Sequence, residues 1–163
     1  TFLDSDLDIH PRQLLTLIKY MDEENADIVI GSKRHKESKV EYPIKRRILS
    51  WGYHMFVNAL FRLNVKDTQS GFKLLRRKCA EKVLPKVLVK KFAFDLELLV
   101  VANKYGFKIT EAPIEIRQLF NGSSVGLGAI KGMLQDTLAI AYRLYIMKYY
   151  DEDHVVPKVL EKK

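Results

Sequence analysis

Residues 1–31 read TFLDSDLDIHPRQLLTLIKYMDEENADIVIG, and their pattern indicates a strand, a helix and a second strand. The apolar start at Phe2 is typical of a strand end. Pro11 suits the first turn of a helix, and apolar side chains then recur at helical spacing to about Glu24. The β-branched run 26–31 is typical of a buried strand. Strand, helix and strand within about thirty residues form a βαβ unit, which predicts a parallel sheet.

The rest of the chain alternates between helical and strand patterns in the same way. The pattern therefore predicts an α/β fold in which helices flank a mainly parallel sheet, with an amphipathic helix near the C-terminus. We expect a strand carrying Pro113 to lie at a sheet edge or beside a bulge. The expected elements are helices over 47–63, 79–89, 95–105 (ended by Gly106) and 127–150, and strands at the end of 67–75 and over 107–116.

Composition limits the classes of protein to which the chain can belong. Its 163 residues, 47% apolar and 29% charged, are typical of one soluble globular domain. The single Cys79 excludes an internal disulfide and a paired-cysteine metal site, which favours a reducing, intracellular setting. No apolar run approaches the roughly 18 residues that span a bilayer.

The net charge of +8 is concentrated in one short stretch. Residues 33–47 hold seven Lys or Arg against two Glu. Such a stretch attracts phosphate on nucleic acid, on a lipid headgroup or on a small substrate. A solvated loop is the alternative interpretation, and composition alone leaves the choice open.

Three carboxylates, Asp4, Asp6 and Asp8, follow the first predicted strand. Ligands of open α/β sheets gather at the carboxyl ends of parallel strands. Because neighbouring carboxylates repel one another, a hard cation between them is expected, and Mg²⁺ or Mn²⁺ suits oxygen ligands. Mg²⁺ completes its shell with substrate phosphates, which points to a diphosphate substrate. A polar turn followed by a helix cap is the plainer interpretation of the same residues.

Motifs further along the chain favour the metal-binding interpretation. In order, these motifs are LDSDLDIHP (3–11), ADIVIGSKR (26–34), DTQSGFKLLRR (67–77) and FAFDLELLVVA (92–102). Together they resemble the family 2 glycosyltransferases, specifically the dolichyl-phosphate mannose/glucose synthase branch. The resemblance implies a GT-A fold in which Asp4 and Asp6 hold a metal bound to the diphosphate of a sugar nucleotide. Asp8 falls where such enzymes often have another oxygen ligand.

The resemblance also implies how the chain is organised. Members of that family carry a further N-terminal half, before the carboxylates, that binds the nucleotide base and ribose. We therefore expect the chain to be the C-terminal portion of a longer enzyme, inactive alone if that half is required. We assign residues 1–126 to a partial GT-A domain, 127–150 to an amphipathic helix at a membrane interface, and 151–163 to a loosely ordered tail.

The reaction implied by the resemblance moves a sugar from a GDP- or UDP-linked donor to a polyprenyl phosphate such as dolichyl phosphate. The acceptor phosphate is largely ionised at neutral pH, so positive charge is needed more than a strong base. Asp6 and Asp67 are the candidate catalytic residues, although a turn role explains Asp67 nearly as well. The candidate substrate-binding residues are Lys33, Arg34, Arg46, Arg47, Gln69, Ser70, Arg117 and Ser124.

Two features modify this interpretation. Many relatives carry Lys after a Gly-x-Ser segment where this chain has Val125, so backbone amides near Ser124 are the candidate anion site instead. Helices 47–63 and 127–150 suit an anionic membrane surface, with the enzyme peripheral on its cytoplasmic face. Packing on the sheet or in a homodimer explains both helices equally well.

A fragment that binds lipid phosphate without catalysis remains the alternative function of the chain. A nucleic-acid module is disfavoured because no recognised motif is present.

Overall fold

The computed structural model describes residues 1–3, 9–39, 44–90, 93–116 and 127–151, and for residues 44–49 and 127 it describes the backbone alone. The elements alternate along the chain as an α/β fold. The helices are η1 (Pro11–Gln13), α1 (Leu14–Glu23), α2 (Ile44–Phe61), α3 (Arg77–Val83), η2 (Leu84–Lys86), α4 (Phe94–Lys104), α5 (Leu127–Tyr145) and η3 (Tyr149–Asp151), and the strands are β1 (Ile28–Ser32), β2 (Lys73–Leu75) and β3 (Ile109–Pro113).

The strands form a mixed sheet in the order β2-β1-β3. β1 runs parallel to β3, placing Ile28 opposite Ile109, and antiparallel to β2, placing Ile28 opposite Leu75. Phe2 makes an antiparallel bridge to Lys73 of β2. Phe2 and β1 therefore run in the same direction, as the predicted βαβ unit requires, but β2 lies between them. This corrects the expectation of a mainly parallel sheet. β3 lies at an edge, as Pro113 indicated.

β1 is buried on both faces, which explains its continuous apolar sequence. Successive side chains of a strand point to opposite faces. Val29 accordingly packs with Leu17 and Met21 of α1 on one face. Ile28 and Ile30 pack on the other face in the large core cluster that α2, α4 and α5 share.

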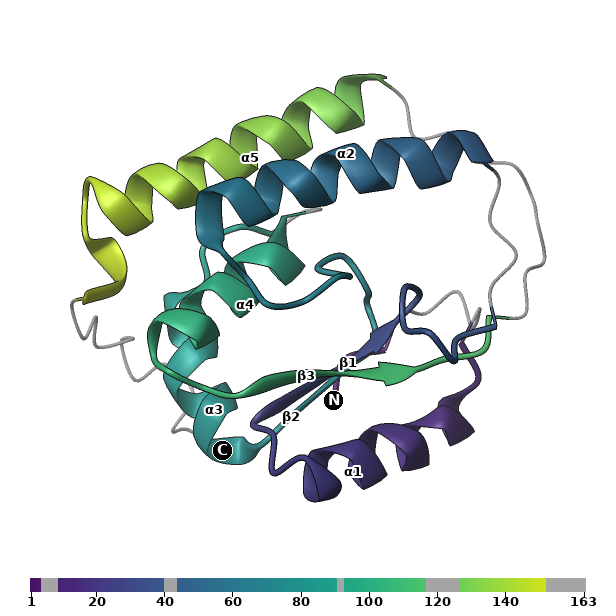
Figure 1. Ribbon diagram of the computed structural model, residues 1–163. Helices are drawn as coiled ribbons and strands as arrows, with labels where there is room; N and C mark the ends of the chain where they lie inside the picture. The colour runs from purple at the N-terminus through teal and green to yellow at the C-terminus, as the bar shows by residue number, and fades with distance from the viewer. Residues whose placement is uncertain (4–8, 40–43, 91–92, 117–126, 152–163) are drawn as a thin grey trace, which may run out of the picture.

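Figure 1 shows the resulting layers: α1 covers one face of the sheet, α4 lies over the other, and α2 and α5 run side by side in the outermost layer. α5 ends at Tyr145, earlier than the predicted 150, and the chain turns back through Lys148, which has φ 50°, into η3. The helix predicted over 79–89 is divided into α3 and η2. No helix of the described chain is both long and apolar enough to cross a membrane.

A buried carboxylate joins the end of the chain to α4. Glu97 is fully buried. Its Oε1 accepts from Arg143 Nη2 at 2.8 Å and from the Tyr150 hydroxyl at 2.5 Å. Its Oε2 accepts the amide N–H groups of Leu88 and Val89 at 2.8 and 2.7 Å. Glu97 therefore has a structural role in binding α5 and η3 to α4, beyond the helix-dipole role that its place in the first turn indicated.

Candidate functional site

The site lies where β1 ends, around the DTQSG loop, which we define as residues 67–71. Asp67 is 9% exposed. Its Oδ2 accepts the backbone N–H of Lys33, the residue after β1, at 3.0 Å. Its Oδ1 accepts the N–H of Gln69 at 3.3 Å, which is an Asx turn. The Asp67 carboxylate therefore both shapes its own loop and fixes that loop at the carboxyl end of β1, where ligands of α/β sheets gather.

A second carboxylate supports the same loop from β3. Oε1 of Glu111 accepts the backbone N–H of Lys66 at 3.0 Å and that of Asp67 at 2.9 Å. Sequence reasoning did not identify Glu111, because nothing in the strand pattern shows that its side chain reaches a loop more than forty residues earlier. The DTQSG loop is thus bound to the end of β1 and to the middle of β3.

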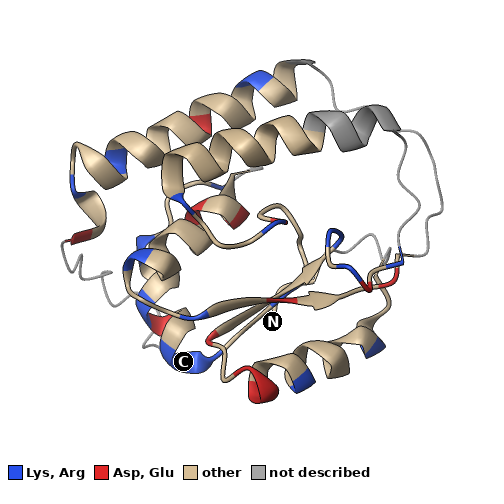
Figure 2. Cartoon of the chain, viewed as in Figure 1, with Lys and Arg blue, Asp and Glu red and all other residues tan. Residues whose placement is uncertain are grey.

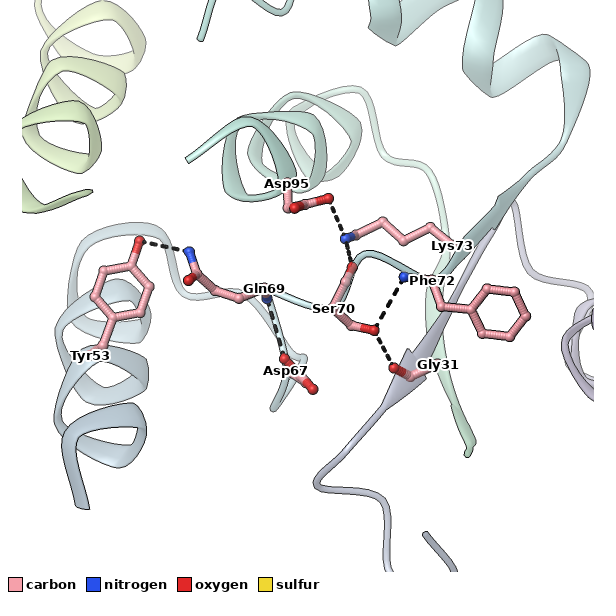
Figure 3. A network of polar contacts seen from close by, with 8 residues as sticks. All are labelled: Gly31, Tyr53, Asp67, Gln69, Ser70, Phe72, Lys73 and Asp95. Carbon is pink, nitrogen blue, oxygen red and sulfur yellow. Dashed lines mark hydrogen bonds and ion pairs between the residues drawn. The ribbon is translucent and has the colours of Figure 1, made fainter. Parts of the chain in front are cut away.

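Ser70 lies at the buried centre of the loop (Figure 3). Its hydroxyl donates to the carbonyl of Gly31 at 2.5 Å and accepts the N–H of Phe72 at 3.4 Å. A Cβ on Gly31 would lie 2.7 Å from Ile114 and 2.9 Å from Phe72, so only glycine permits this approach. The Ser70 hydroxyl thus both donates and accepts a hydrogen bond within the protein, which gives Ser70 a loop-shaping role in this structure.

A buried ion pair closes the loop on its other side. Lys73 is fully buried, and its Nζ lies 2.6 Å from Asp95 Oδ1 of α4 while also donating to the carbonyl of Ser70 (Figure 3). Asp95 lies in the first turn of α4, a place typical of a residue that stabilises the helix N-terminus, and the structure makes it the counter-ion of Lys73. Removing one partner of such a pair is costly because the other charge stays buried. The loop conformation therefore depends on α4.

Gln69 joins the loop to the outer helices. Its Nε2 donates to the Tyr53 hydroxyl of α2 at 3.4 Å (Figure 3). The Tyr53 hydroxyl lies 2.9 Å from the Thr137 hydroxyl of α5, which donates to the carbonyl of Met133 at 2.7 Å. Burial raises the pKa of Tyr53, so its hydroxyl stays protonated at neutral pH. The predicted residue Gln69 thus belongs to a hydrogen-bond chain that ends in α5.

Arg34 extends from the loop after β1 to α2. Its Nη2 donates to the Ser50 hydroxyl at 2.7 Å, and its backbone N–H donates to Ser32 Oγ at 3.2 Å. The Lys33 amide thus contacts the Asp67 carboxylate, and Arg34 is the next residue in the chain. The backbones of Arg46 and Arg47 lie in the first turn of α2, but their side chains lie outside the described part.

His54 of α2 belongs to the same region. Its Nδ1 is shielded from solvent and has no hydrogen-bond partner within the described residues. Burial lowers the pKa of His54, and the charge of Arg34 lowers it further, while Glu111 and Asp67 oppose these effects. Sequence reasoning missed His54. The available signal was a histidine in an otherwise mostly apolar helix.

The predicted metal ligands Asp4, Asp6 and Asp8 lie outside the described residues, as do Arg117 and Ser124. The residues flanking the carboxylates are described: Phe2 pairs with Lys73, and Ile9 is buried and bridges Ile116. Within the described ranges, no group of three His, Cys, Asp or Glu is suited to hold a metal. Carboxylate oxygens are the donor type that Mg²⁺ and Mn²⁺ prefer, so the Asp4–Asp8 set fits such an ion by its chemistry.

Comparison with known proteins gives a consistent result. The sequence model of Glycosyl transferase family 2 matches residues 1–84. The chain is 30% identical over 151 residues to dolichyl-phosphate beta-glucosyltransferase ALG5A of Trichomonas vaginalis, covering 91% of this chain and 45% of the relative. It is 29% identical over 126 residues to dolichyl-phosphate beta-glucosyltransferase of Dictyostelium discoideum, covering 76% and 38%. It is 35% identical over 116 residues to ALG5C of T. vaginalis, covering 70% and 34%. The chain spans less than half the length of these curated relatives.

Proposed function

The chain is a member of glycosyl transferase family 2, and from this premise we propose that it takes part in transferring a hexose from a nucleotide-diphosphate donor to a polyprenyl phosphate. The names of the relatives favour glucose as the sugar and dolichyl phosphate as the acceptor. The observation that carries the proposal is the Asp67 carboxylate, held at the carboxyl end of β1 by the amide of Lys33, the residue that precedes Arg34. A carboxylate can accept from sugar hydroxyls and a guanidinium can donate to a phosphate, so transfer of a sugar to a phosphate needs both groups in one site.

In this proposal, Asp4 and Asp6, with Asp8 nearby, hold Mg²⁺ or Mn²⁺. When bound, the ion neutralises charge that develops on the leaving diphosphate. Donor binding should therefore depend on these carboxylates. All three carboxylates supply oxygen ligands, so the proposed ion needs no histidine or cysteine ligand.

Arg34 is the residue we assign to the acceptor phosphate. A guanidinium has five N–H donors in a fixed fork that matches phosphate geometry. Among the described residues, the Arg34 side chain bonds Ser50 alone, so further donors remain for a ligand. Lys33, Arg46, Arg47 and Arg117 add positive charge, and backbone amides near Ser124 add neutral donors.

Asp67 and Gln69 are assigned to the hexose. Each side chain is held by the protein: Asp67 by two backbone amides and Gln69 by Tyr53. A carboxylate accepts through two oxygens with about four lone-pair sites, so Asp67 can also accept from a sugar hydroxyl. Ser70 contributes by shaping the loop, and its peptide group remains near the substrate in the proposal. Positioning of this kind supplies rate through orientation.

The outer face of α2 and α5 is the proposed contact with an anionic membrane on its cytoplasmic side. The two helices carry large exposed apolar side chains: Trp51, which is 60% exposed, Met55, Leu134, Leu138, Tyr142 and Tyr145. Figure 2 shows that the described part of α2 carries no charge and that charges on α5 are few. Lys131 at the start of α5 and Lys148 after its end suit anionic headgroups. A polyprenyl tail would lie in that bilayer.

A flotation assay tests this membrane contact. Protein mixed with vesicles containing anionic lipid at low salt should float with the vesicles, and Trp51→Ser together with Leu138→Ser should leave it in solution. Leu15→Ser, on the exposed side of α1, is the matched control, since α1 lies on the opposite face of the sheet. A wild-type chain that stays in solution refutes the membrane contact, and self-association of the same face would favour a homodimer.

A transfer assay tests the reaction. The chain would be supplied with Mn²⁺, dolichyl phosphate and radiolabelled UDP-glucose, with GDP-mannose in a parallel arm, and the labelled lipid extracted. Transfer that Asp6→Ala abolishes and Asp22→Asn leaves intact supports the proposal, because Asp22 is an exposed carboxylate of α1. Binding of polyprenyl phosphate with no transfer in either arm would favour the alternative of a non-catalytic lipid-phosphate-binding fragment.

A further inference from the structure

His54 carries a polar atom whose role the contacts described above do not explain. The residue lies on the inner side of α2, one turn after Ser50 and three residues before the buried Val57. Trp51 and Met55 occupy the exposed side of the same helix. Nδ1 of His54 is shielded from solvent and unpaired among the described residues. Its imidazole therefore belongs to the interior and the site, and not to the apolar outer face.

Charged groups from three different elements act electrostatically on this ring. Arg34 comes from the loop after β1, Asp67 from the DTQSG loop and Glu111 from β3, and each acts on the pKa of His54. Burial is the largest effect and lowers that pKa, as Arg34 does, so the ring is neutral at neutral pH. A neutral imidazole offers one N–H donor and one acceptor nitrogen.

The two carboxylates near the ring already have partners. Asp67 accepts two backbone amides, and Oε1 of Glu111 accepts two more. Among the described residues, the Arg34 guanidinium is bound through Nη2 to Ser50 and to no carboxylate. Within the described part of the chain, the charge without a counter-ion near His54 is thus the Arg34 cation, held at Ser50 one helical turn away, which favours an anionic ligand. Buried polar atoms of native proteins are nearly always hydrogen-bonded, so the unpaired Nδ1 also indicates a missing partner.

We propose that His54 is a further acceptor-binding residue, whose Nδ1–H donates to an oxygen of the polyprenyl monophosphate that Arg34 attracts. This inference rests on the proposed function, in which Arg34 receives the acceptor phosphate. It adds a neutral donor beside the guanidinium. A monophosphate offers several oxygens, so it can accept from both donors at once.

The assignment has a thermodynamic consequence that a structural histidine lacks. A phosphate beside the ring favours the imidazolium, so it raises the pKa of His54 above its value in the free protein. By linkage, protonation of His54 strengthens phosphate binding by the same factor. Arg34 opposes this protonation, and Asp67 and Glu111 assist it. Protonation of the phosphate, whose second pKa is about 6, weakens binding to the wild type and to a His54 variant alike. The ratio of wild-type affinity to that of His54→Ala should therefore rise as pH falls below 7.

Substitutions at position 54 separate the two ring nitrogens. An asparagine amide nitrogen lies near the place of Nδ1, whereas a glutamine amide nitrogen lies near that of Nε2. In calorimetric titration with farnesyl monophosphate, the dissociation constant of His54→Asn should lie within about threefold of that of the wild type. His54→Gln and His54→Ala should each weaken binding about tenfold, the loss expected for one hydrogen bond to an ion. Asn58→Ala, on the exposed side of α2, is the matched control.

Nitrogen-15 spectra of the imidazoles provide the second measurement. The Nδ1 resonance of His54 should move on addition of farnesyl monophosphate, and inorganic phosphate should produce the same direction of change if the headgroup is responsible. Equal weakening by all three His54 variants with an unmoved Nδ1 resonance overturns the proposal in favour of a structural role. Unchanged affinities, or a wild-type chain that binds neither phosphate ligand, overturn it as well. Arg34→Ala weakening binding while His54 variants do not would leave the proposed function standing.

Discussion

Replacing Asp67 with asparagine removes one charge and almost no volume, so it tests what the carboxylate contributes. In the native protein each carboxylate oxygen accepts one backbone N–H: Oδ2 that of Lys33 at 3.0 Å and Oδ1 that of Gln69 at 3.3 Å. An asparagine side chain has one oxygen and one NH₂ group. In either orientation, the NH₂ group must face one of these two backbone donors, and that hydrogen bond is lost.

The magnitude follows from these two contacts. A hydrogen bond to a charged group contributes about 1.5–3 kcal/mol, and a neutral one contributes about 1 kcal/mol. Asp67→Asn loses one charged bond and weakens the other, so we expect unfolding free energy to fall by about 2–4 kcal/mol. Asp67 is only 9% exposed, so water replaces the lost partner poorly. The total free energy of unfolding of a small domain is about 5–15 kcal/mol, so the variant should still fold.

Urea unfolding followed by circular dichroism gives the stability change, and the transfer assay gives kcat and KM on the same samples. Asp22→Asn on α1 is the control, because its carboxylate contacts only the exposed Arg76 among the described residues. A change below about 0.5 kcal/mol would refute the view that Asp67 holds the DTQSG loop to β1. A stability loss with unchanged kinetics would assign Asp67 to the loop alone and remove it from the hexose site.

Three further substitutions test other parts of the architecture. Gly31→Ala places a Cβ 2.7 Å from Ile114 Cγ2, and we expect urea unfolding to show a loss of about 1–3 kcal/mol from overpacking. Glu97→Gln leaves the Arg143 charge without its buried partner, so the same measurement should show unfolding free energy lower by about 3–5 kcal/mol. A loss below about 1 kcal/mol would contradict the role of Glu97 in binding α5 to α4. Tyr53→Phe removes the hydroxyl that accepts from Gln69, and we expect donor KM to rise a few-fold with a change in unfolding free energy near 1 kcal/mol. An unchanged KM would show that the Gln69 contact does not orient the loop.

The local pattern of the sequence was sufficient for most elements of the fold. The helix ended by Gly106 was predicted, and the structure gives Gly106 a φ of 73° with the Phe107 N–H bonded to the Ala102 carbonyl, which is a Schellman ending. Cys79 is a buried free thiol, and burial raises its pKa to about 12. The family resemblance was confirmed.

The direction of β2 was not accessible in the same way. A strand of three residues carries almost no periodicity. Its antiparallel pairing is decided by partners at Ile28 and Phe2, more than forty residues away in sequence. A strand-helix-strand pattern indicates two parallel strands but does not exclude a third strand inserted between them. The mixed sheet is therefore a property of long-range pairing, which local patterns do not encode.

The candidate site shows the same division between local and long-range information. Asp67 and Gln69 were found because their motif is contiguous in sequence. Glu111 and Asp95 act on that motif from other elements, and their residue types fit exposed strand or capping roles equally well. His54 was missed because one polar residue in an apolar helix is uninformative until the helix has been placed. Sequence reasoning thus identified the loop, and the structure identifies what holds it.

α2 connects the two halves of the proposed function. Its exposed side carries Trp51 and Met55, and its inner side carries Ser50, Tyr53 and His54. An α-helix is about 10 Å across, so a membrane against the first set would lie roughly one helix diameter from the second. A phosphate at the surface of that membrane would then need to move only a short distance to reach Arg34. In the proposed function, the uncharged outer side of the described part of α2 and the polar residues on its inner side serve one requirement: an acceptor whose tail lies in lipid and whose phosphate must reach Arg34.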